Sequence, residues 1–165
     1  MLLRAGITVA LMELVFCPPP TITAHQEYIE VKIVEEAEVM DETDKMSEYF
    51  ETQEGITNLL CVYAEAGNQG YEGMRKVEAV ILNRRDSKTF PDTIDGVITQ
   101  KYQFSSYPSG MEKWRGKALA SEECKQAIWD EINARSDTRI VFFRTGHYSE
   151  YGTPAYKYKD HYFSY

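Results

Sequence analysis

The carboxylate of Glu65 is the side chain in this sequence whose surroundings best suit acid–base chemistry. Helical spacing places Glu65 beside Asn58, Cys61 and Val62, so its neighbours on the expected helix carry no charge. A glycine-containing turn over residues 67–70 follows, which puts the acid at the mouth of a loop. A carboxyl group in such a place is suited to giving and taking a proton during a reaction. From spacing alone, a solvated glutamate at a helix end remains the simpler interpretation.

Aromatic side chains gather in the second half of the sequence. Fourteen of the 21 aromatic residues lie between residues 102 and 165. Tyrosine in a loop offers a flat apolar face and a polar tip, which suits stacking on sugar rings, so this distribution favours a carbohydrate ligand. The alternative is that several of these rings pack the core of a small sheet.

A loop rich in Ser, Pro and Gly, residues 86–110, carries the first candidate contacts for such a ligand. Gln103 offers donors and acceptors for acetamido groups, and Phe104 and Tyr107 offer ring faces. Phe104 has a second interpretation, as a core residue that holds the loop down.

Five further residues are singled out by type and position. Glu72 begins a helix, where a carboxylate interacts favourably with the helix dipole, and it is also a candidate substrate contact. Asn83 and Arg84 close the same helix, and we expect them to bind backbone or loop groups. His161 and Phe163, near the end of the chain, are expected to form the floor of a cleft facing Glu65.

No recognisable metal or cofactor motif occurs in the sequence. His147 and His161 have no HExxH or CxxC pattern nearby, and neither a G-x-S-x-G elbow nor a glycine-rich phosphate loop is present. We therefore expect neither a metal ion nor a cofactor. The net charge is −8, which argues against a nucleic-acid partner, because phosphate contacts need clustered positive charge.

Charge and hydropathy divide the chain into three parts. Residues 1–24 resemble a secretory signal peptide, with a short apolar arm as the alternative, and their apolar run is too short for a stable membrane span. Residues 25–54 contain eleven acidic residues against two lysines, which predicts an acidic and flexible linker. Residues 55–165 are close to neutral and are expected to fold as one monomeric domain.

Hydrophobic periodicity predicts the elements that must position these residues. The spacing of Ile56, Leu59, Leu60 and Tyr63 is typical of a core-facing helix. Further helices are predicted over residues 72–85 and 117–134, and strands over residues 139–143 and 156–163. The predicted fold class is α+β and mainly helical, with a small β-sheet or hairpin near the C-terminus.

Two cysteines lie in the expected domain. Cys61 and Cys124 fall on apolar-flanked positions of predicted helices. The sequence favours two buried thiols, with a disulfide between them as the alternative.

Ordered blocks of this sequence resemble the SleB/CwlJ-type cell-wall hydrolase family, over about residues 56 to 165. The blocks are Val62-Tyr63-Ala64-Glu65-Ala66, Tyr71-Glu72-Gly73, Val80-Ile81-Leu82-Asn83-Arg84, Phe90-Pro91-Asp92-Thr93-Ile94, Gly96-Val97-Ile98, Gln103-Phe104-Ser105, Gly146-His147 and Asp160-His161-Tyr162-Phe163. One departure is Gln69, which stands where the typical family turn has an acid, so any role of that acid is not carried over to this chain.

The resemblance implies a lysozyme-like catalytic domain that degrades bacterial peptidoglycan, with spore germination as the best-known setting and Glu65 as the catalytic residue. The implied reaction breaks the linkage from N-acetylmuramic acid to N-acetylglucosamine, in some members as a lytic transglycosylase. One carboxyl group then suffices, because the 6-hydroxyl of muramic acid replaces water. The implied location is outside the cell or in the bacterial envelope, including the spore.

Two other functions stay open. The domain could be a non-catalytic peptidoglycan-binding module in which Glu65 is idle. It could also be an envelope interaction protein that works through its acidic segment.

Overall fold

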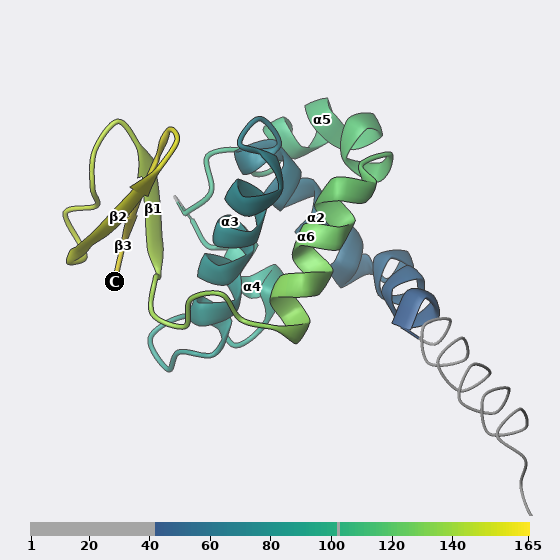
Figure 1. The fold of residues 1–165 in the computed structure, drawn as a ribbon, viewed down its shortest axis with the longest axis horizontal. Helices are drawn as coiled ribbons and strands as arrows, with labels where there is room; N and C mark the ends of the chain where they lie inside the picture. The colour runs from purple at the N-terminus through teal and green to yellow at the C-terminus, as the bar shows by residue number, and fades with distance from the viewer. Residues whose placement is uncertain (1–41, 102) are drawn as a thin grey trace, which may run out of the picture. The chain divides into compact units, whose positions relative to one another are not determined.

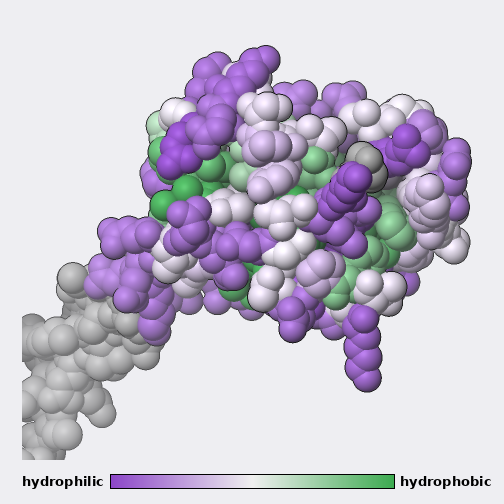
Figure 2. Space-filling view, turned by 180° about the vertical axis from the view of Figure 1, so that it is seen from behind, coloured by the Kyte–Doolittle hydropathy of each residue, from purple (hydrophilic) through white to green (hydrophobic). Residues whose placement is uncertain are grey.

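A computed structural model describes residues 42–101 and 103–165 and shows helices packed beside a small antiparallel sheet (Figure 1). This arrangement confirms the predicted α+β, mainly helical class. Seen from behind, the surface is mostly hydrophilic, with apolar patches set among charged side chains (Figure 2). None of the described helices is both long and apolar enough to cross a membrane. The elements are a helix over residues 42–51, α2 (Gln53–Ala66), α3 (Gly70–Arg85), α4 (Ile94–Thr99), α5 (Ser109–Leu119), α6 (Glu122–Asn133), β1 (Phe142–Thr145), β2 (Pro154–Tyr158) and β3 (His161–Ser164).

Helices α2 and α3 form where periodicity predicts them. The side chain of Thr52 caps α2 by accepting a hydrogen bond from Gly55 N, and Leu59 and Leu60 are buried below it. On α3 the apolar face is buried in the same core, against α2 and α6. The sheet lies on the other side of α3, so this helix is the centre of the domain (Figure 1).

The strand predicted over residues 139–143 is β1, shifted to Phe142–Thr145. Three other elements differ from prediction, each because of a local cap or turn. The segment 86–110, expected to be a loop, contains α4, which Thr93 caps by accepting from Gly96 N. The helix expected over residues 117–134 is two helices, because Ser121 ends one run and caps α6 by accepting from Cys124 N. The strand expected over 156–163 is the hairpin of β2 and β3, which turns at Lys159 with a left-handed φ of 46°.

The sheet has the order β1-β3-β2, and both pairings are antiparallel. Phe163 in the central strand pairs with Phe143 on one side and Tyr156 on the other. Phe163 is completely buried in a cluster with Val80 and Ile140, so this strand attaches the sheet to α3.

The helix over residues 42–51 corrects part of the linker prediction. Tyr49 and Phe50 pack against the core, and the Tyr49 hydroxyl accepts a hydrogen bond from Asn58 Nδ2 at 3.1 Å. The count of charges predicted a solvated spacer here, whereas two aromatic rings among the acids are enough to dock the helix. The predicted signal peptide and the linker up to residue 41 lie outside the described residues.

Cys61 and Cys124 are free, buried thiols, which confirms the first of the two alternatives. Burial raises the pKa of both thiols well above their ordinary value.

A buried acid lies beside the docking point of the first helix. Glu78 on α3 is completely buried, and its Oε1 accepts a hydrogen bond from Asn58 Nδ2 at 3.0 Å. Burial is the main reason that the pKa of Glu78 rises to about 8. Among residues 42–101 and 103–165, Glu78 Oε2 and Asn58 Oδ1 have no hydrogen-bond partner, and the protonated form of Glu78 has an O–H group that can donate.

We predict that Glu78 makes the domain less stable as pH rises. The unfolded chain loses this proton near the ordinary glutamate pKa of 4.5, whereas the folded domain keeps it until about pH 8. The free energy of unfolding should therefore be highest below the lower value, fall between the two, and level off above the higher one. Urea denaturation of Glu78→Gln across this range should show no such fall from this site, while Glu72→Gln, on an exposed part of α3, should keep it. A wild-type fall that persists unchanged in Glu78→Gln contradicts the prediction.

Candidate active site

Glu65 lies on the last turn of α2 and is half-buried. Its Oε1 accepts a hydrogen bond from the backbone N–H of Ser106 at 3.0 Å, so the loop before α5 covers the end of α2. A backbone amide stabilises the ionised form of a carboxyl group and fixes its orientation. The structure therefore brings the predicted acid together with the predicted loop.

Phe104 holds this loop in place from within the core. It is only 5% exposed, and its ring lies 6.0 Å from that of Phe143 on β1. The N–H of Tyr107 donates to the carbonyl of Phe104 at 3.2 Å, which closes a turn with Ser106 inside it. The prediction that Phe104 offers its face to a sugar is wrong in this structure, and the core interpretation holds. Gln103 is half-buried, whereas Tyr107 is 42% exposed.

His161 on β3 lies near enough to Glu65 for their charges to interact. The imidazole is 3% exposed and packs against the rings of Phe143 and Phe163 at 5.1 and 6.0 Å. Burial lowers the pKa of His161, against the opposing effects of Glu65 and Asp160, so the ring is neutral at neutral pH. Its Nδ1 is buried and has no hydrogen-bond partner in the part of the chain that the structure describes.

Phe163 requires a correction, because it was expected in the floor of the cleft. It has no exposed surface and belongs to the core between the sheet and α3. Alternation along a strand points neighbouring residues to opposite faces, but the sequence does not state which face meets the helices. Phe163 therefore supports His161 and cannot touch a sugar directly.

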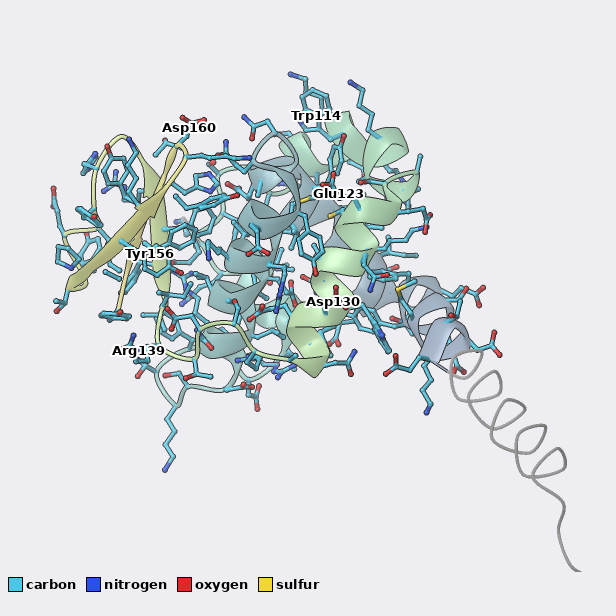
Figure 3. The ribbon with its side chains drawn as sticks, in the orientation of Figure 1. Trp114, Glu123, Asp130, Arg139, Tyr156 and Asp160 are labelled. Atoms are coloured by element: carbon cyan, nitrogen blue, oxygen red, sulfur yellow. The ribbon has the colours of Figure 1, made fainter. Side chains whose placement is uncertain are left out.

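Gln69, in the turn between α2 and α3, connects that turn to the β2–β3 hairpin. Its Nε2 donates to Asp160 Oδ2 at 3.0 Å, and its Oε1 accepts from Asp160 N at 3.3 Å. Lys159 also donates to the backbone carbonyl of Gln69. Figure 3 shows Asp160 on the side of the sheet that faces α3. Sequence analysis identified Gln69 only as a departure from a family pattern, whereas here it positions the strand that carries His161.

The remaining predicted residues have separate places. Glu72 is exposed in the first turn of α3. Asn83 donates to the carbonyls of Asp137 and Ile140 at 2.9 and 2.7 Å, and Arg84 Nε donates to the carbonyl of Val141 at 2.6 Å. The expectation that Asn83 and Arg84 bind backbone groups is confirmed.

Within residues 42–101 and 103–165, no cluster of three or more His, Cys, Asp or Glu side chains could hold a metal ion. That no metal is required stays a prediction.

Comparison with known proteins supports an enzymatic site. A family model described as Cell Wall Hydrolase matches residues 68–164, a range that begins just after Glu65. The spore cortex-lytic enzyme of Oceanobacillus iheyensis is 40% identical over 73 residues, which cover 44% of this chain and 25% of that enzyme. The spore cortex-lytic enzyme of Bacillus subtilis (strain 168) is 36% identical over 85 residues, which cover 50% of this chain and 27% of that enzyme. The chain thus spans about a quarter of the length of these relatives.

The fold is also similar to solved catalytic domains. The catalytic domain of the germination-specific lytic transglycosylase SleB from Bacillus anthracis superimposes with a TM-score of 0.58 at 28% identity. The match covers 69% of this chain and 96% of that domain. The catalytic domain of the Bacillus cereus SleB protein gives a TM-score of 0.55 at 27% identity and covers 91% of that chain.

We predict that Phe104→Ala destabilises the domain by about 3–5 kcal/mol, because it empties a buried aromatic site. Tyr107→Ala, three residues further along the same loop, removes an exposed ring and should change the free energy of unfolding by less than about 0.5 kcal/mol. Urea denaturation of both variants measures the difference. Equal stability of Phe104→Ala and wild type would show that Phe104 is not a core residue.

Proposed function

Because the chain belongs to the cell wall hydrolase family, we propose that it cleaves the glycan strands of bacterial peptidoglycan with Glu65 as the general acid and base. The observation that carries this proposal is the Ser106 N–Glu65 Oε1 hydrogen bond, which fixes a half-buried carboxyl group between the end of α2 and the loop before α5. The names of the similar proteins, spore cortex-lytic enzyme and lytic transglycosylase, support a substrate of this class.

The proposed reaction uses one carboxyl group twice. Protonated Glu65 donates its proton to the oxygen that joins C1 of N-acetylmuramic acid to N-acetylglucosamine, and the C1–O bond breaks with both electrons on the leaving oxygen. The Glu65 carboxylate then removes the proton from the 6-hydroxyl of the same muramic acid, whose oxygen forms the new bond to C1. The product is a 1,6-anhydro end, and Glu65 regains its proton.

The surroundings of Glu65 support both steps. The Ser106 amide holds one carboxyl oxygen and stabilises the charge that appears after proton donation. A neutral His161 adds no positive charge beside Glu65 on the β3 side. Its ring is 3% exposed, so in this proposal His161 borders the site and does not bind the glycan, contrary to its expected place in the floor of the cleft. In this proposal Gln103, the exposed Tyr107 and the exposed Glu72 line the approach to Glu65 and contact the glycan.

The proposed setting follows from the substrate. Peptidoglycan lies outside the cytoplasmic membrane, so we place the domain outside the cell or in the bacterial envelope, spore cortex included, and acting as a monomer. A wall-binding module with an idle Glu65 is the competing function, and the next experiment separates the two.

We predict that Glu65→Gln lowers the rate of clearing of purified cell walls by about a hundredfold or more, because glutamine cannot donate or accept the proton. Glutamine keeps an oxygen that can accept from Ser106 N, so the fold and wall binding should remain. Glu54→Gln removes an exposed carboxyl group from the first turn of the same helix and should leave activity unchanged.

Mass spectrometry of the released fragments identifies the reaction. Anhydro ends support the transglycosylase step, whereas reducing ends show that water attacks C1. Wall clearing that is equal in Glu65→Gln and wild type, or absent from both while binding persists, contradicts catalysis by Glu65.

A second prediction concerns metals. Treatment with EDTA should leave wall clearing and the melting temperature unchanged, since the described residues offer no ligand cluster. Activity that EDTA removes and one divalent ion restores would show a required metal.

A further inference from the structure

The last turn of α3 contains a buried cation without a carboxylate partner. Arg84 is 4% exposed, and among residues 42–101 and 103–165 it forms no ion pair. Burial lowers the pKa of its guanidinium to about 10, so it is still charged at neutral pH. Burying a charged group costs free energy unless its neighbours replace the interactions with water that it loses.

Arg84 lies among aromatic rings from three segments of the chain. Its guanidinium carbon is 5.0 Å from the ring centre of Phe90, 5.4 Å from that of Phe142 and 5.7 Å from that of Phe104. Rings at this range attract a cation through their negative faces, more strongly when water is excluded. The hydrogen bond from Arg84 Nε to the Val141 carbonyl fixes the direction of the guanidinium plane.

Phe104, one of these three rings, belongs to the loop that hydrogen-bonds to Glu65. Phe104 is joined to Tyr107 by a backbone hydrogen bond, and the turn between them presents the N–H of Ser106 to Glu65. The Ser106 carbonyl in turn accepts from Met111 N at the start of α5, at 3.0 Å. The orientation of the Glu65 carboxyl group thus depends on the position of Phe104.

We propose that Arg84 is a positioning residue for Glu65, acting through the Phe104 ring and the Ser106 amide. The inference rests on the proposed function only for its activity readout, because the contacts of Arg84, Phe104 and Ser106 exist in the free protein. Arg84 does not reach the substrate. It holds the loop that orients the acid.

Because burying an unpaired charge costs free energy, a variant without the charge can distinguish the positioning of Glu65 from a contribution to stability alone. Replacement of Arg84 by an apolar side chain of similar length removes the buried charge, so the melting temperature should stay the same or rise. The loop loses its attraction to the cation, however, and the Ser106 amide should become less well fixed. A small error in the placement of a catalytic group lowers the rate of the chemical step more than the affinity for substrate.

The experiment compares Arg84→Met with Arg85→Met in the full chain. Arg85 is the next residue on α3 and pairs with Asp86 at 2.8 Å, away from the three rings, so it is the matched control. With soluble glycan strands as substrate, Arg84→Met should lower kcat about tenfold or more and leave KM within about twofold. Hydrogen exchange followed by NMR should show faster exchange of the Ser106 amide than in wild type, with the Lys125 amide of α6, which donates to the Ser121 carbonyl, as internal reference. Arg85→Met should match wild type in all these measurements.

The two readouts distinguish the failure of this inference from the failure of the proposed function. A wild type without glycan cleavage rejects the function, yet faster Ser106 exchange in Arg84→Met still supports the positioning role. Unchanged Ser106 exchange, or an unchanged kcat in an active protein, overturns the inference. If Arg84→Met does not fold, Arg84→Lys tests the other half of the contact, because it keeps the charge near the rings and loses the Nε–H bond to Val141 that orients the side chain. Faster Ser106 exchange in Arg84→Lys then supports the positioning role, and unchanged exchange overturns it.

Discussion

Burial of the Phe104 ring joins the helical core to the small sheet. The ring packs in the same cluster as the apolar faces of α2 and α3, and it contacts Phe143 on β1. A loop rich in polar residues would otherwise have little to hold it against the end of α2, because its own backbone bonds are few. The Phe104 ring packs against both the helices and the sheet. It therefore fixes the positions of Glu65, of the Ser106 amide and of the strand that carries His161 relative to one another.

Sequence reasoning predicted the parts of this domain that local patterns encode. The spacing of Ile56, Leu59, Leu60 and Tyr63 was enough to place α2, since one helix face must be apolar to reach the core. Glu65 was singled out by its uncharged neighbours on the helix, but only the resemblance to the cell-wall hydrolase family made it the catalytic candidate. The breaks that were missed, at Ser121 and in the β2–β3 turn, depend on single capping or turn residues, which are weak signals beside a run of hydrophobic periodicity.

Long-range contacts account for the rest. Phe104 and Phe163 have the residue type of a sugar-stacking ring, and only the tertiary packing places both inside. The helix over residues 42–51 has an acidic composition, but Tyr49 reaches Asn58 in the core, a contact that charge counting does not reveal. The Gln69–Asp160 pair joins positions far apart in the chain, so no local pattern could have predicted it.

Buried polar groups in this domain differ in how fully they are satisfied. Glu131 on α6 is completely buried and accepts from Arg75 Nε at 3.1 Å and from Ser136 N at 2.8 Å, so its charge is compensated by a cation and an amide. Glu78 has a single amide donor, and Arg84 has rings in place of an acid. Among the described residues, polar atoms without a partner thus remain in the middle of α3, at Glu78, and in its last turn, at Arg84, whereas both carboxyl oxygens of Glu131 are bonded.

Because two hydrogen bonds join Gln69 and Asp160, the effect of a substitution at either position depends on the residue at the other. A carboxylate at position 69 would face the Asp160 carboxylate across the same short distance, and two like charges there would push the hairpin away from the turn. In this chain, Gln69→Glu would therefore weaken the attachment of the β2–β3 hairpin to the turn after α2. A substitution at only one of the two positions would remove the hydrogen bonds that hold the hairpin against the turn after α2. The position of His161, at the start of β3, would then no longer be fixed from that side.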